Sequence, residues 1–240
     1  MSAFDDLLHE AECGNAAAQC ELARMYDVGD GVQKDTAHAV SLYQKALALG
    51  STEAMCALAF KYDRGEGVEA DAQKALALYR QAADAGDALA CAIVGNKYEC
   101  GKCLPQDFER AAEYYEKAAQ QGHCAAQYFL ARLIDRHRVD SDPDIMMELY
   151  ESAAALGHPG AMLAAGLKYD AGEVVAQNPQ KALMYYESAA QAGYAPAQYM
   201  AALSYQMGRG VKPDAAKALH YLKAAAGQGY APARQALKGA

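Results

Sequence analysis

The string GDGVQKD at residues 29–35 returns as GEGVEAD at residues 65–71 and as GRGVKPD at residues 208–214. Glycine-rich strings occur in phosphate-binding loops, but such a loop occurs once in a domain, follows a strand and ends in Lys-Ser or Lys-Thr. None of the three copies is followed by either pair. The recurrence therefore indicates a repeat protein rather than a nucleotide site.

Three series of residues share one period. The first is a glycine series with intervals of 36, 36, 36, 35, 36 and 36 residues: Gly14, Gly50, Gly86, Gly122, Gly157, Gly193 and Gly229. The second is Tyr26, Tyr62, Tyr98, Ile134, Tyr169 and Tyr205. The third is Tyr43, Tyr79, Tyr115, Tyr150, Tyr186 and Leu222. Because the three series are independent and in step, chance is a poor explanation for them.

Each unit predicts two helices joined by the glycine-rich loop. Small and apolar residues at helical spacing mark the first helix, as in Ala54, Leu58 and Tyr62. A glycine just after a helix can adopt the left-handed conformation that ends it. The second helix has a side chain suited to N-capping in every repeat: Asp35, Asp71, Asp107, Asp142, Asn178 and Asp214. Pro143 and Pro179 follow two of these caps, where proline is favoured.

The predicted fold is therefore all-α, an α/α superhelix or solenoid of helix-turn-helix repeats. We expect one domain over residues 1–240, with six repeats and two half-repeats that cap the stack. The repeats are expected at residues 15–50, 51–86, 87–122, 123–157, 158–193 and 194–229, and the half-repeats at 1–14 and 230–240.

The pattern resembles the Sel1-like repeat family, which is related to the tetratricopeptide repeat. The motifs are AxxxLAxxY, GxGVxxD and KAxxxYxxAAxxG, as in Ala54–Tyr62, Gly65–Asp71 and Lys74–Gly86, and the resemblance covers residues 4–238. Repeat 4 departs most, because Ile134 replaces the tyrosine and RHRVDSD (136–142) replaces the glycine loop. The resemblance implies a non-enzymatic scaffold or adaptor that holds a protein along its concave face.

Composition narrows the classes of function. A formal charge of -8 argues against a general nucleic-acid binder, and no stretch is long and apolar enough to span a membrane. The acidic N-terminus lacks the apolar segment of a signal peptide, and an odd count of seven cysteines fits reduced thiols, so we expect a cytoplasmic protein. We find no motif of a catalytic centre or a cofactor site, and we expect neither.

Candidate partner-binding residues follow when the concave face of related repeats is mapped onto the first helices. They are Arg24, Asp27, Phe60, Asp63, Asn96, Glu99, Tyr128, Arg132, Asp135, Leu167, Asp170, Tyr199 and Leu203. Five of them form an acidic row one residue after the tyrosine position: Asp27, Asp63, Glu99, Asp135 and Asp170. Either loop amides satisfy these carboxylates, or they face a positively charged ligand. The second explanation predicts a protein or peptide partner with basic and apolar side chains.

Two other hypotheses remain open. The chain could be an inhibitor or immunity protein that sequesters a basic partner protein, which the same acidic row would favour. It could also be a metal- or thiol-dependent sensor centred on repeats 3 and 4, where Cys100 and Cys103 form a C-x-x-C pair. A structural zinc site needs four ligands, and a second C-x-x-C is absent. His123 and His158 share one repeat position just after a closing glycine, which suggests a role in the turn.

Overall fold

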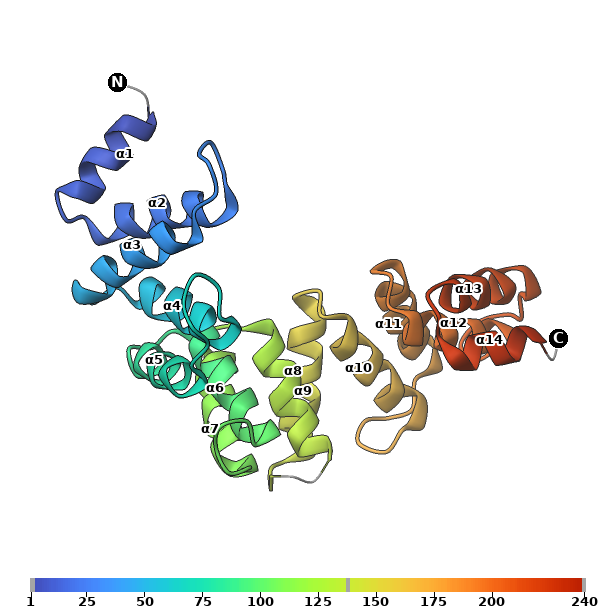
Figure 1. Cartoon of the computed structure of the whole chain (residues 1–240). Coiled ribbons are helices and arrows are strands. Elements are labelled where there is room, and N and C mark those ends of the chain that lie inside the picture. Colours follow the sequence, from blue (N-terminus) through green and yellow to red (C-terminus); the bar gives the residue numbers. More distant parts are fainter. Residues whose placement is uncertain (1–2, 137–138, 239–240) are drawn as a thin grey trace. The chain divides into compact units, whose positions relative to one another are not determined.

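The computed structural model describes residues 3–136 and 139–238, and all the regular secondary structure in these residues is helical (Figure 1). The chain divides into two compact units, unit 1 at residues 1–121 and unit 2 at residues 122–240. Each unit is described by itself.

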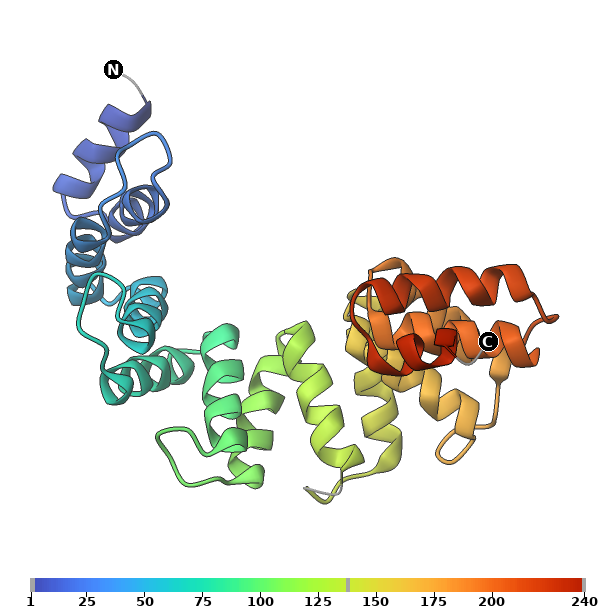
Figure 2. The ribbon, with the colours of Figure 1, turned by 45° about the vertical axis from the view of Figure 1, so that its right-hand side comes forward.

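Seven helices lie in the described part of each unit. Unit 1 contains α1 (Ala3–Glu12), α2 (Ala16–Val28), α3 (Thr36–Ala48), α4 (Thr52–Arg64), α5 (Ala72–Asp84), α6 (Ala88–Cys100) and α7 (Phe108–Gln120). Unit 2 contains α8 (Cys124–Asp135), α9 (Pro143–Ala155), α10 (Pro159–Ala171), α11 (Pro179–Gln191), α12 (Ala195–Met207), α13 (Ala215–Gly227) and α14 (Ala231–Lys238). Within each unit every helix packs against the next one along the chain (Figure 1, Figure 2). The predicted α/α superhelical fold class is confirmed.

The glycine-rich loops end and start helices as the sequence predicts. Gly29, Gly65 and Gly208 are left-handed, with φ of 82°, 69° and 70°, and each ends the first helix of its repeat. The six predicted N-caps of the second helices all accept hydrogen bonds from backbone amides of the first turn. Pro143 and Pro179 are the first residues of α9 and α11. The recurring glycine-rich string is thus the connection between the two helices of a repeat.

Two histidines cap first helices in unit 2. His123 Nδ1 accepts from the Ala126 amide at 3.2 Å, and His158 Nδ1 accepts from the Ala161 amide at 3.1 Å. His158 also stacks on Tyr128, with ring centroids 4.3 Å apart. The turn role expected for this repeat position is therefore N-capping by an imidazole nitrogen that carries no proton.

This cap should make stability depend on pH. Burial lowers the pKa of His158 below its ordinary value of 6.5, so the unfolded chain binds more protons than the folded chain in mildly acidic solution. The stability that the neutral His158 cap contributes is fully present above pH 6.5. It is lost as the pH falls from 6.5 through the lowered pKa of the folded state. We expect His158→Asn, which caps without titrating, to lose less stability than the wild type between about pH 7.5 and about pH 5. Thermal melts at the two pH values measure this, and equal losses in both proteins would contradict it.

Candidate functional site

Four of the five carboxylates of the acidic row are paired with cations of this same chain. Lys61 Nζ donates to Asp27 at 2.6 Å, and Lys97 Nζ donates to Asp63 at 3.0 Å. In unit 2 Lys168 donates to Asp135, and Arg209 donates to Asp170 at 3.2 Å. Three of these cations lie one residue before the tyrosine position of the following repeat: Lys61, Lys97 and Lys168.

Buried tyrosines of the second helices donate to two carboxylates of the row. Tyr115 donates to Glu99 at 2.8 Å, and Tyr150 donates to Asp135 at 3.3 Å. Burial, and then the charge of Asp27, raises the pKa of Tyr43 to about 12. Four carboxylates of the row are therefore satisfied by inter-repeat ion pairs rather than by loop amides, and the local charge available to a basic ligand is reduced accordingly.

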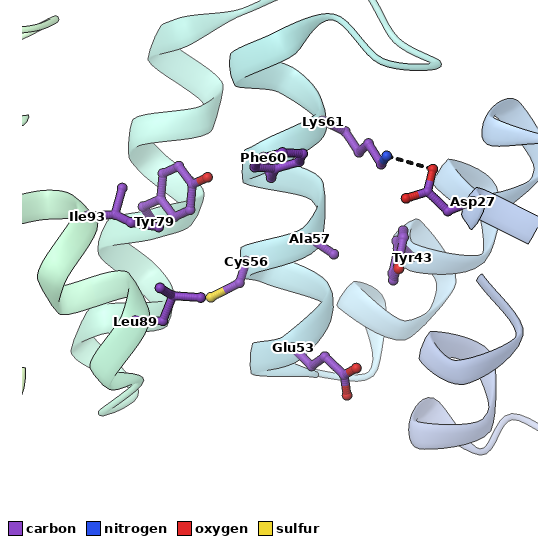
Figure 3. A pocket seen from close by; sticks show the side chains of 10 residues that line it. All are labelled: Asp27, Tyr43, Glu53, Cys56, Ala57, Phe60, Lys61, Tyr79, Leu89 and Ile93. Atoms are coloured by element: carbon purple, nitrogen blue, oxygen red, sulfur yellow. Dashed lines mark hydrogen bonds and ion pairs between the residues drawn. The ribbon is translucent and has the colours of Figure 1, made fainter. Parts of the chain in front are cut away.

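A hollow of 350 Å³ opens on the first helices of unit 1. Figure 3 shows the side chains that line it, with Cys56 and Phe60 on the side of α4 that faces α6, and Lys61 on the side that faces Asp27 of α2. We call this hollow the α4–α6 groove. Its lining residues are Asp27, Tyr43, Glu53, Cys56, Ala57, Phe60, Lys61, Tyr79, Leu89 and Ile93.

The α4–α6 groove exposes apolar side chains to solvent. Phe60 is 44% exposed and Leu89 is 53% exposed, whereas the nearby Lys61 is only 4% exposed. Burial raises the pKa of Cys56 to about 12, so this thiol stays protonated and is a poor nucleophile. The groove thus combines an apolar wall with a polar side whose lysine is already paired, which suits binding rather than covalent chemistry.

The structure brings only some of the predicted residues together. Asp27 and Phe60 line the α4–α6 groove. In unit 2, Leu167 lines one hollow of 510 Å³ with Asp170 and another of 270 Å³ with Asp135.

The remaining predicted residues lie in separate environments. Arg24 is exposed and pairs with Glu21, and Asp63 is held by Lys97. In unit 2 the guanidinium of Arg132 lies 5.6 Å from the ring centre of Tyr128. The others are half-buried: Asn96, Glu99, Tyr199 and Leu203.

Sequence reasoning missed the part of the groove that α6 supplies. Leu89 and Ile93 are four residues apart and therefore share one face of α6. The exposure of Leu89 on the first turn of a helix otherwise rich in buried residues was not visible in the repeat pattern, because a leucine there also suits a core position. The spacing of four residues between Leu89 and Ile93 was the signal in the sequence that could have shown this apolar face.

The described residues give no support to a metal centre. No three His, Cys, Asp or Glu side chains of residues 3–136 and 139–238 lie together in a way that could hold a metal ion. Cys100 and Cys103 are free and exposed, and Cys103 takes the left-handed place of the second loop glycine with φ of 65°. In the part of the chain that the structure describes, no helix has both the length and the apolar character needed to cross a bilayer.

An all-helical array in which successive helices pack on one another belongs to the class of α-solenoid repeat proteins. The Sel1 repeat model matches residues 16–51, 52–87, 88–123, 124–158, 159–194 and 195–230, so the chain belongs to the Sel1 repeat family. Sel1 repeat proteins are generally non-catalytic scaffolds for protein interactions. A comparison with curated proteins found no match.

Solved structures of similar proteins share this fold. A Sel1 repeat protein from Oxalobacter formigenes is 28% identical with a TM-score of 0.82, covering 90% of this chain and 89% of that one. A protective antigen of uropathogenic Escherichia coli is 25% identical with a TM-score of 0.60, and the match covers 95% of this chain but 56% of the antigen. An immunity protein from Pseudomonas aeruginosa is 24% identical with a TM-score of 0.55, covering 90% of this chain and 82% of that one, and this likeness concerns the fold alone.

Proposed function

We propose that this chain is a non-enzymatic scaffold that binds a partner protein through the α4–α6 groove. The observation that carries this proposal is the pair of exposed apolar side chains, Phe60 and Leu89, on the walls of one hollow. Exposed aromatic and aliphatic side chains around a concavity are typical anchors of protein interfaces, because burying them releases water from both partners.

The groove favours an apolar anchor from the partner over a basic one. Lys61 neutralises Asp27, toward which it points in Figure 3, and its ammonium group also lies 5.9 Å from the ring centre of Phe60. Within residues 3–136 and 139–238, Glu53 is the lining carboxylate that forms no ion pair, and it is exposed at the first turn of α4. A leucine, methionine or phenylalanine side chain on an extended or helical segment would therefore fill the apolar wall. The hollows around Leu167 are proposed as further contact positions within unit 2.

An inhibitor or immunity role for this chain lacks a specific observation in its favour. The hypothesis relied on an acidic face that would attract a basic protein, and four carboxylates of that row are paired internally. The immunity proteins resemble this chain in fold, which does not determine function. A scaffold with an apolar anchor site is the better supported proposal.

The test compares two double variants in affinity capture with quantitative mass spectrometry. Phe60→Ser with Leu89→Ser removes the exposed apolar wall and should lower capture of the specific partner by at least about tenfold. Leu156→Ser with Met184→Ser is the matched control, because these side chains are 55% and 66% exposed but lie outside the groove. Binding constants with the purified partner then separate a groove effect from a change in expression.

Equal capture of every partner by the wild type and the groove variant, with both proteins folded by circular dichroism, would overturn the proposal. A loss caused equally by the control variant would also overturn it, because the effect would then follow apolar exposure in general.

A further inference from the structure

A cluster of tyrosine, cation and carboxylate recurs in unit 2. Tyr169 donates to Glu151 at 2.7 Å, and Lys181 donates both to the same carboxylate oxygen, at 2.8 Å, and to the Tyr169 hydroxyl. Tyr185 stacks on Tyr169 with ring centroids 6.0 Å apart. The same arrangement recurs one repeat later, where Tyr205 donates to Glu187 at 2.6 Å, accepts from Lys217 at 3.2 Å and stacks on Tyr221 at 6.1 Å.

Unit 1 contains a similar cluster in which an arginine replaces the carboxylate. Tyr98 stacks on Tyr114 with ring centroids 5.8 Å apart, and Arg110 donates to its hydroxyl at 3.2 Å. The position that holds Glu151 and Glu187 in the other clusters, 18 residues before the tyrosine, is Arg80. Arg80 donates to the same Tyr98 hydroxyl at 2.7 Å. Two guanidinium groups therefore converge on one phenolic oxygen where the other clusters hold a carboxylate.

The charges of this cluster are incompletely balanced. Arg110 has a carboxylate partner in Asp107, at 3.4 Å, but Asp107 also caps α7. Among the described residues no carboxylate forms an ion pair with Arg80, whose guanidinium donates to the Tyr98 hydroxyl and lies 5.6 Å from the centre of the Tyr98 ring. The Tyr98 oxygen accepts from both guanidinium groups, so neither bond uses the phenolic proton.

The protonation behaviour of the tyrosines reflects the same difference. Burial raises the pKa of Tyr98, but hydrogen bonds from Arg110 and Arg80 outweigh burial, and the pKa is lowered overall. The hydrogen bond to Glu187 raises the pKa of Tyr205 in the corresponding cluster. Negative charge is thus stabilised at the Tyr98 cluster and disfavoured at its counterpart.

We propose that Arg80, Tyr98 and Arg110 form a carboxylate-binding site that accepts an Asp or Glu side chain of a protein. The incoming carboxylate pairs with the guanidinium groups of Arg80 and Arg110, and it supplies the negative charge that Glu151 and Glu187 supply in unit 2. Arg80 adds planar donors suited to a carboxylate. None of the three residues lines the α4–α6 groove, so this is a second site. That the carboxylate belongs to a partner protein rests on the proposed function, whereas carboxylate binding at this site does not.

The test titrates the full chain with two capped tripeptides, acetyl-Ala-Glu-Ala-amide and acetyl-Ala-Gln-Ala-amide, at constant ionic strength. Nitrogen-15 NMR follows the side-chain signals of Arg80 and Arg110. We expect both signals to shift and saturate with the Glu peptide, with an affinity on the order of tens of millimolar for one partly exposed contact, and to stay unchanged with the Gln peptide. Inorganic phosphate is titrated as a third probe.

Arg80→Glu rebuilds the unit 2 cluster and should abolish the response of Arg110 to the Glu peptide without lowering the melting temperature. Lys223→Glu is the matched control, because Lys223 holds the equivalent repeat position, is exposed and undergoes the same change of charge. It should bind as the wild type does. Three results would overturn the assignment. The Arg80→Glu variant could bind the Glu peptide as tightly as the wild type does, or the wild type could respond equally to the Gln peptide. The third is that phosphate binds more than tenfold more tightly than the Glu peptide. None of these outcomes depends on a partner binding to the α4–α6 groove.

Discussion

Gly210→Ala is expected to destabilise unit 2 by about 2–5 kcal/mol, the sum of left-handed strain and overpacking. Gly210 has φ of 71°, and a Cβ at this residue would lie 2.3 Å from the carbonyl oxygen of Pro179 and 2.5 Å from its carbonyl carbon. These are backbone atoms at the start of α11, so no side-chain rotation can relieve the contact. The loop after α12 thus packs directly on the start of α11. The added methyl group of alanine would force the loop and the helix apart.

The matched control is Gly193→Ala. Gly193 is also left-handed, with φ of 81°, but no atom lies within 4 Å of the position of its Cβ. This variant should therefore lose only the conformational part, about 1–2 kcal/mol. Hydrogen exchange resolves the effect by helix, because repeats contact only their neighbours and the loss for Gly210→Ala should centre on α11, α12 and α13. Equal losses in the two variants would show that the contact with Pro179 relaxes.

Local signals predicted the helix boundaries because capping depends on residues close in sequence. Asp71 caps α5 through the amides of Gln73 and Lys74, two and three residues away. Gly65 ends α4 through a hydrogen bond to Lys61, four residues away. The loop at Cys103 shows a limit of this reasoning, because its left-handed conformation persists without glycine.

The partners of the acidic row could not be predicted in the same way. The bond between Asp27 and Lys61 spans 34 residues and depends on how one repeat stacks on the next. A lysine occurs at this position in repeats 2, 3 and 5, but repeat 6 has Ser204 there, and Arg209 of the following loop pairs with Asp170 instead. Periodicity fixes which residues are equivalent, but it does not fix which neighbours touch across repeats. The α4–α6 groove was missed in part for the same reason, since Leu89 belongs to the next repeat.

Lys61→Met is expected to lower the free energy of unfolding of unit 1 by about 2–3 kcal/mol, somewhat below the usual cost of breaking a fully buried pair. The Lys61 side chain is 5% exposed and its ammonium group contacts Asp27 at 2.6 Å and Glu66 at 3.0 Å. Methionine keeps most of the apolar stem, so the main loss is the charge. Asp27, only 22% exposed and beside Tyr43, is then left without its cation.

A double variant separates this charge effect from packing. Adding Asp27→Asn to Lys61→Met removes the stranded carboxylate and should recover most of the lost stability in urea denaturation, because the cost lies in the unpaired charge. Arg24→Met is the control for an exposed pair: Arg24 and Glu21 are 53% and 47% exposed, and no measurable change is expected. If Lys61→Met melted like Arg24→Met, the inter-repeat pairs would be incidental, and Asp27 would be free to meet a basic ligand. A large loss that the double variant recovers would instead show that these carboxylates serve the stacking of the repeats, which leaves the apolar wall of Phe60 and Leu89 as the binding feature of the groove.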